Sequence, residues 1–87
     1  MIKVQLDRNN TYQVVVDEGG SSTTHMVTLE DGYYQKLTGG KESKEDLIQR
    51  SFEFLLQRES KESILRSFDL PIIGRYFPDY ESKISLK

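Results

Sequence analysis

The stretch from Ser43 to Tyr80 holds most of the large apolar side chains, and it constrains the fold of this chain more than any other feature. Its first part has the pattern of an amphipathic helix, and its second part is a tail rich in Ile, Leu, Phe and Tyr. The chain has 87 residues and no cysteine, so no disulfide can substitute for a hydrophobic core. We therefore predict one small domain over residues 1–87 whose core depends on this stretch.

The first third of the chain alternates apolar and polar residues, which is typical of half-buried strands. The alternation covers residues 2–6, 12–16 and 23–29, and clusters of Asp, Asn, Gly and Ser separate these runs. Short turns of this kind join antiparallel neighbours. We predict a three-stranded antiparallel meander over about residues 2–29, with His25 and Val27 on the same face of the third strand.

Residues 30–80 form the predicted helical part. A short helix is expected to start at Thr28 and to stop at Gly39-Gly40, because glycine adopts the left-handed conformation that ends helices. Ser43 opens a longer helix over residues 43–59, since Ser followed three residues later by Asp is a capping signal. The apolar positions of this helix cover roughly 200° of its circumference, so we expect neighbours on two of its sides.

The segment after the long helix is predicted to form short helical turns. One such helix is expected over residues 60–68, and a separate turn over residues 72–77 is bracketed by Pro71 and Pro78. Residues 81–87 are predicted to be a frayed tail. The predicted fold class is therefore α+β: a three-stranded antiparallel meander packed against one main amphipathic helix, with short C-terminal helical turns.

Composition excludes several classes of function. The net charge is −2, so nothing global attracts the chain to nucleic acid or to anionic lipid. The N-terminal residues alternate in polarity, unlike a secretory signal, and no window approaches the length of a membrane span. These observations predict a cytoplasmic protein for which nucleic acid is an unlikely partner and which does not enter a membrane.

Motifs that carry chemistry are missing from the sequence. His25 is the only histidine and there is no cysteine, so we predict no catalytic, cofactor or metal site. The run from Gly39 to Ser43 fails as a phosphate-binding loop, because Gln35 stands where the first glycine belongs. We therefore do not expect an enzyme, although a pocket of ordinary carboxylates stays open as an alternative.

Residues 26–58 resemble a ribbon-helix-helix protein, with the pattern L-I-x-x-S at residues 47–51. In that family a short strand pairs with the same strand of a second chain, and the ribbon enters the DNA major groove. The resemblance implies a dimeric DNA-binding regulator or antitoxin. Against this, no Lys or Arg lies between residues 9 and 35, although phosphate contacts supply much of the affinity for DNA.

The segments SFEFLLQRE, SILRSFDL and RYFPDY, over residues 51–59, 63–70 and 75–80, are similar to a group of small uncharacterised bacterial proteins. This resemblance implies a bacterial origin and no particular mechanism.

The tail suggests how the protein is used. The turn over residues 72–77 carries an apolar and aromatic surface, a composition that is enriched at protein interfaces. We predict a non-catalytic protein-protein interaction or accessory protein that binds another protein or a second copy of itself. The predicted contact residues are Ile72, Ile73, Arg75, Tyr76 and Phe77. The alternative is a ribbon-helix-helix-like DNA-binding dimer.

Overall fold

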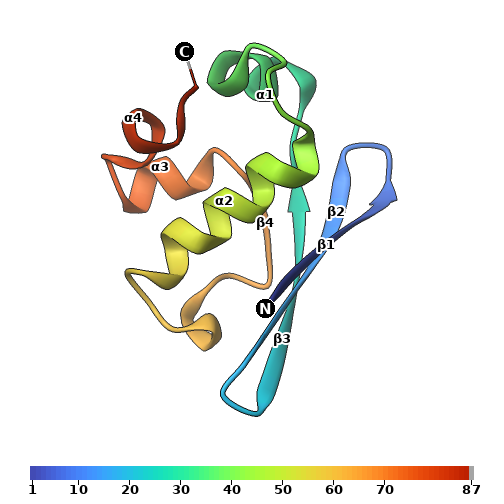
Figure 1. The fold of residues 1–87 in the computed structure, drawn as a ribbon, viewed down its shortest axis with the longest axis vertical. Helices are drawn as coiled ribbons and strands as arrows, with labels where there is room; N and C mark the ends of the chain where they lie inside the picture. Colours follow the sequence, from blue (N-terminus) through green and yellow to red (C-terminus); the bar gives the residue numbers. More distant parts are fainter. Residues whose placement is uncertain (87) are drawn as a thin grey trace.

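The computed structural model describes residues 1–86 and shows an α+β protein in which the helices gather on one side of a four-stranded sheet (Figure 1). The strands run in the spatial order β1-β2-β3-β4. In chain order the elements are β1 (Ile2–Arg8), β2 (Thr11–Glu18), β3 (Ser21–Thr28), α1 (Asp31–Thr38), α2 (Lys44–Leu56), the 3-10 turn η1 (Lys61–Ser63), β4 (Ser67–Asp69), α3 (Ile72–Tyr76) and α4 (Tyr80–Ile84).

The predicted meander of three antiparallel strands is confirmed. Val14 at the centre of β2 pairs with Val4 of β1 and with His25 of β3. Gly19 and Gly20 join β2 to β3 with φ values of 66° and 81°, which L side chains rarely adopt and which match the twist of a tight hairpin. The buried side chains of β2 and β3 face the helices and share one core with those of α2.

A fourth strand corrects the predicted sheet and the helix expected over residues 60–68. β4 lies parallel to β3, with Phe68 opposite Val27. Two backbone hydrogen bonds frame it, from Met26 N to Arg66 O at 2.8 Å and from Leu70 N to Thr28 O at 2.9 Å. Exposure alternates along β4, because Phe68 is half-buried between two exposed neighbours, and this is the period of a strand.

The start of the first helix also differs from the prediction. Thr28 is the last residue of β3, and α1 begins only at Asp31 with Glu30 as its N-cap. The two other signals are confirmed: Gly39 ends α1 with φ 61°, and the Ser43 hydroxyl accepts a hydrogen bond from the Asp46 backbone N–H.

The long helix α2 has neighbours on two sides, as its wide apolar face predicts. Toward the sheet, the Phe52 ring lies 5.4 Å from the His25 ring and 6.1 Å from the Phe68 ring. Toward the C-terminal helices, the Phe54 ring lies 5.3 Å from the ring of Tyr80 and 5.9 Å from that of Phe77. The core is thus built around α2.

The end of the chain is ordered by packing, in contrast to the frayed tail predicted for residues 81–87. α4 buries Tyr80 and Ile84, which lie four residues apart on one face of the helix. The Leu86 backbone N–H then donates to the Leu37 carbonyl at 2.7 Å. The final residue, Lys87, lies outside the described residues.

Candidate functional site

The structure distributes the five predicted contact residues over α3 and the residue after it. Ile73 points into the core and is 2% exposed. Ile72 and Phe77 are half-buried, Arg75 is exposed, and Tyr76 is 65% exposed. α3 therefore anchors itself through Ile73 and offers mainly Tyr76 to the surroundings.

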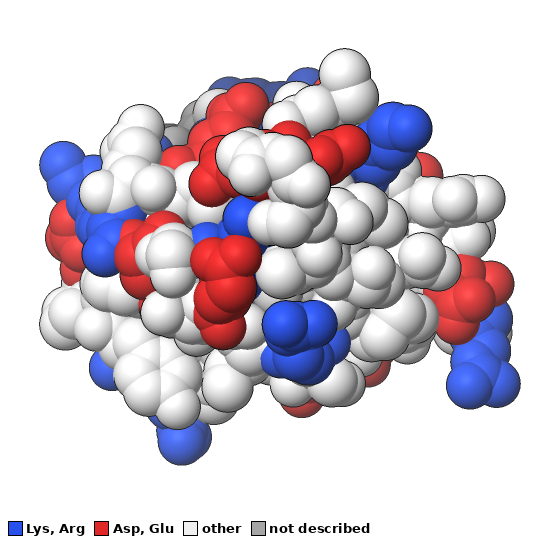
Figure 2. Space-filling view, turned by 90° about the horizontal axis from the view of Figure 1, so that it is seen from below, with Lys and Arg blue, Asp and Glu red and all other residues white. Residues whose placement is uncertain are grey.

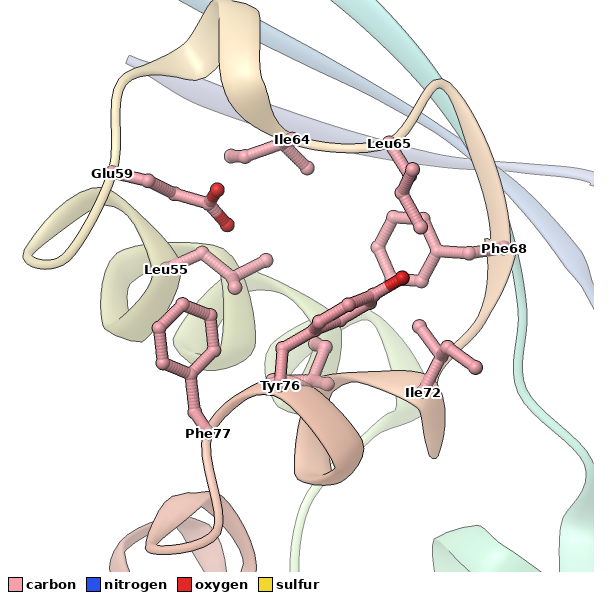
Figure 3. A pocket seen from close by; sticks show the side chains of 9 residues that line it. Leu55, Glu59, Ile64, Leu65, Phe68, Ile72, Tyr76 and Phe77 are labelled. Carbon is pink, nitrogen blue, oxygen red and sulfur yellow. The ribbon is translucent and has the colours of Figure 1, made fainter.

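Four of these residues line an apolar hollow between α2, β4 and α3 (Figure 3). The hollow is shallow, with a cavity volume of only about 20 Å³, and it is partly open to solvent. Its lining comes from a single stretch of the chain, residues 55–77, which folds around it. The lining residues are Leu55, Glu59, Ile64, Leu65, Phe68, Ile72, Ile73, Tyr76 and Phe77. Arg75 does not belong to this lining.

Exposed apolar side chains gather at this hollow. Tyr76 is 65% exposed and Leu65 is 46% exposed, although both are large and apolar. Among the described residues only Met1, Leu6 and Leu86 are comparable, and none of these three lines the hollow. A clustered pair beside a preformed hollow is more informative than scattered single residues, which are normal on protein surfaces.

Glu59 brings one charge to the apolar lining. Figure 3 shows its carboxylate pointing into the hollow, between Ile64 and Leu55. Burial raises the pKa of the Glu59 carboxyl above its usual value, because the apolar surroundings disfavour the charged form. Within residues 1–86 no cation pairs with it, whereas Glu42, Asp79 and Glu81 all have ion-pair partners.

Aromatic packing holds one wall of the hollow in place. The Phe77 ring meets the Phe54 ring edge to face, at an interplanar angle of 80°. The Arg58 guanidinium lies over the Phe54 ring, 3.6 Å from its centroid. It also binds the Asp79 carboxylate at 3.0 Å. Packing against Phe54 therefore holds the Phe77 ring in place, so that its wall of the hollow is preformed.

A buried histidine positions the opposite wall. The His25 Nδ1–H donates to the Leu65 carbonyl at 2.7 Å, since a carbonyl can only accept, and Nε2 then accepts from the Thr23 hydroxyl at 2.8 Å. Burial lowers the pKa of His25, and the bond to Leu65 partly opposes this effect. His25 thus has a structural role: it holds the backbone of a residue that lines the hollow.

Groups that could perform catalysis do not converge at this hollow. Its only ionisable lining residues are Glu59 and Tyr76. A second, polar hollow lies along α2, but there Arg50 already binds Glu42 through two nitrogens, with Nε 3.1 Å from Oε1. In the part of the chain that the structure describes, no three His, Asp or Glu side chains are grouped to hold a metal ion.

The sequence predicted the lining residues contributed by α3 and Phe77, but it did not predict the lining residues that come from α2, β4 and the segment between them. Leu55, Ile64 and Phe68 belong to the apolar stretch from which only a core was predicted, and no sequence pattern indicated Glu59 as a site residue. Only the tertiary arrangement shows that these residues and Leu65 surround one space. The alternation of S-F-D-L at residues 67–70 could have indicated β4, and with it the position of Phe68.

The geometry does not favour a DNA-binding ribbon. β3, the strand that would pair with a second chain, already lies between β2 and β4 over residues 26–28. On the face shown in Figure 2, acidic and basic side chains are interspersed around a neutral area, without a continuous basic stripe among the described atoms. Binding through residues 26–28 of β3 would therefore require β4 to leave the sheet.

No protein-family model, no curated protein and no solved structure shows a significant match to the chain. The two resemblances seen in the sequence therefore stay predictions, and the candidate function depends on the hollow itself. None of the helices formed by residues 1–86 has the length and apolar character needed to cross a membrane.

Proposed function

We propose that this protein is a non-catalytic interaction protein that binds another protein through the apolar hollow. The observation that carries the proposal is the pair Tyr76 and Leu65, which both line a preformed apolar hollow and yet stay exposed. The bacterial origin and cytoplasmic location expected from the sequence belong to the same proposal.

Energetics support a binding role for this pair. Tyrosine provides a large contact area with few rotatable bonds, and it is enriched among residues that dominate binding energy. An apolar side chain entering the hollow would cover Tyr76 and Leu65 together. Burying a large apolar side chain completely contributes about 1.5–3 kcal/mol, and both residues realise only part of this in the free protein.

The hollow is also preorganised. Phe77 is held by Phe54 and Arg58, and the Leu65 backbone is held by His25. A partner therefore does not need to order a loop on this side of the interface. Association then avoids part of the entropic cost that weakens many interfaces of similar size.

Photo-crosslinking tests the proposal directly. A photoreactive phenylalanine analogue at position 76 should form a discrete protein adduct in cell lysate, while the same group at Gln13 serves as the matched control. Gln13 is exposed on β2 and points away from the helices, because its neighbours Tyr12 and Val14 are buried. Equal adduct formation at the two positions would contradict the proposal.

Self-association is separated by sedimentation of the purified protein. The variant Tyr76→Ala with Leu65→Ser removes the exposed pair and leaves the anchored residues Ile73 and Phe77 intact. If the partner is a second copy, the wild type dimerises with increasing concentration and the variant stays monomeric. If the partner is another protein, both remain monomeric and only the crosslink at position 76 appears.

A further inference from the structure

The strand β4 has a free edge. It is the last strand in the order β1-β2-β3-β4, so within residues 1–86 no strand lies along its other side. Arg66 and Leu70 direct backbone groups to β3, and peptide groups alternate in direction along a strand. The N–H and C=O groups of Ser67 and Asp69 therefore point outward, and both residues are exposed.

This free edge borders the apolar hollow. Phe68, at the centre of β4, directs its ring into the hollow, and Leu65 and Ile72 line it just before and after the strand (Figure 3). A segment that bonded to Ser67 and Asp69 would extend the sheet beside the hollow. Because side chains alternate across a sheet, every second side chain of that segment would face the hollow.

Two carboxylates lie at this surface. Glu59 lies in the hollow, and Asp69 lies on the strand edge with its side chain on the other face of the sheet. Neither carboxylate has an ion-pair partner among the described residues, although six other pairs form elsewhere. A lysine or arginine from a bound segment would complement them, most strongly beside the half-buried Glu59.

We infer that the partner binds as an extended peptide that adds to the free edge of β4, packs a large apolar side chain over the hollow and places a Lys or Arg beside Glu59. This inference rests on the proposed function and names the kind of segment that is bound. Backbone hydrogen bonds to Ser67 and Asp69 would supply affinity, and the hollow would supply side-chain selectivity.

A second copy of this chain fits the same edge less well. If β4 paired with β4 of another copy around Phe68, each Ser67 would oppose Asp69 of the other copy. The two Asp69 side chains would then be diagonal neighbours about 7–8 Å apart and would repel each other. Pairing of β1 with β4 would join copies head to tail, which produces a ring or an open filament instead of a two-fold dimer.

Selection from phage-displayed random dodecapeptides tests the inference. Peptides are selected on the wild type after depletion on the variant Tyr76→Asp with Leu65→Asp. The expected sequences alternate large apolar residues with polar ones and contain Lys or Arg two positions from the apolar residue. Failure to enrich any peptide that depends on the hollow overturns the inference, and so does enrichment of apolar residues at a spacing of three or four.

The selected peptide is then synthesised with one backbone nitrogen methylated at a time. Strand addition predicts a tenfold or greater loss of affinity at every second position, because only alternate N–H groups face β4. A periodicity of two therefore supports the inference. Uniform tolerance of methylation shows that the peptide does not bind as a strand and overturns it.

Two protein variants test the edge from the other side. Asp69→Pro removes an outward N–H and leaves the bonds made by Arg66 and Leu70, so proline should be tolerated at this position. Asp69→Ser is the matched control, which removes the charge and keeps the N–H. We expect at least a tenfold loss for Asp69→Pro and a smaller change for Asp69→Ser; equal affinities would overturn the inference. If Asp69→Pro does not fold, Ser67→Pro takes its place, and Ser67→Ala is then the matched control.

The charge requirement has its own test. Glu59→Gln should weaken binding of a Lys-containing peptide at least threefold and leave binding of its norleucine analogue unchanged. Failure of the inference is distinguishable from failure of the proposed function. Binding that needs Tyr76 and Leu65 but tolerates Asp69→Pro and backbone methylation keeps the hollow as an interaction site and rejects strand addition. Crosslinks at position 76 that do not exceed those at Gln13 reject both.

Discussion

The C-terminal segments pack around α2 in two different ways. On the α4 side, the Tyr80 hydroxyl lies 2.6 Å from the Ser51 hydroxyl, and Arg50 binds both Glu42 and the Ile84 carbonyl, the latter at 3.0 Å. On the α3 side, an apolar hollow stays open and Glu59 has no cation beside it within the described residues. The polar groups on the α4 side of α2 have hydrogen-bond or ion-pair partners, whereas the α3 side has an open hollow and a carboxylate without an ion-pair partner among residues 1–86.

Two tyrosines four residues apart illustrate the difference. Tyr80 is fully buried, and burial raises the pKa of its hydroxyl. Tyr76 is 65% exposed and its ring rests at the hollow. The same residue type thus contributes to stability on one side, and on the other it is available for binding. We expect substitutions on the two sides to separate these properties.

The largest expected effect is the contrast between Tyr80→Ala and Tyr76→Ala. Tyr80→Ala leaves a large cavity against Phe54 and removes one of the two hydrogen bonds of the buried Ser51 hydroxyl, which keeps its bond to the Leu47 carbonyl. It should therefore lower the free energy of unfolding by about 3–5 kcal/mol. Tyr76→Ala should change it by about 0.5 kcal/mol or less, because the side chain is largely solvated. Urea denaturation of both variants measures the difference.

Similar losses in the two variants would contradict this contrast and would show that Tyr76 closes the core of the free protein. Tyr80→Phe is the control for packing. It keeps the ring and removes the hydroxyl that bonds to Ser51, so it should cost about 1 kcal/mol.

The next effect concerns the ion pair that fastens α4. Arg50→Ala leaves the Glu42 carboxylate, 13% exposed, without its cation and frees the Ile84 carbonyl, so we expect a loss of about 2 kcal/mol. Lys36→Ala is the matched control, since Lys36 pairs with Glu81 at 3.2 Å but is 62% exposed, and it should cost less than about 1 kcal/mol. Equal losses in thermal unfolding would mean that both pairs act as surface pairs.

Local signals allowed much of the fold to be predicted from the sequence. The alternation in residues 2–29, the cap at Ser43 and the stop at Gly39 each act within a few residues. They gave the correct strands and the correct start of α2, whose end was placed three residues too late. The wide apolar face of α2 also correctly indicated neighbours on two sides.

Elements that exist only through tertiary contacts were not predictable in this way. β4 has three residues and depends on pairing with β3, and α4 has five residues and depends on Tyr80 and Ile84 finding the core. Short segments have little intrinsic preference, so packing decides their conformation. The lining of the hollow was predicted only in part for the same reason. The sequence of α3 has a recognisable apolar pattern, whereas the position of Glu59 depends on the turn that follows α2.

A third effect is acid sensitivity through His25, which is the only histidine in the chain. Its pKa is lowered from 6.5 in the folded protein, mainly by burial. As the pH falls through 6.5, the unfolded chain takes up the proton first, so stability should decrease and then level off below the folded pKa. Above about pH 7.5 the group contributes no pH dependence.

Urea midpoints between about pH 7.5 and about pH 5.5 measure this effect, since carboxylates titrate mostly below that window. His25→Leu should be less stable overall, because Thr23 and Leu65 lose a partner, but its stability should be nearly independent of pH in this range. An unchanged slope in the variant would assign the acid sensitivity to other groups.

The smallest effect is expected for Glu59→Gln on the open side. The pKa of Glu59 is raised in the folded protein, so as the pH rises through 4.5 the unfolded state ionises first and stability decreases, until the folded group ionises as well. Glutamine carries no such penalty. At about pH 7 the variant should equal or exceed the wild type by up to about 0.5 kcal/mol, and this advantage should vanish near about pH 4.

Urea denaturation at both pH values tests this sign. A variant that is less stable than the wild type at neutral pH would show that the Glu59 carboxylate already has a favourable partner in the free protein. The α3 side of α2 would then be as saturated as the α4 side, and no charge would remain for a lysine or arginine of a bound peptide. A neutral or stabilising substitution that also weakens peptide binding would instead show that Glu59 serves the interaction at the expense of the free protein.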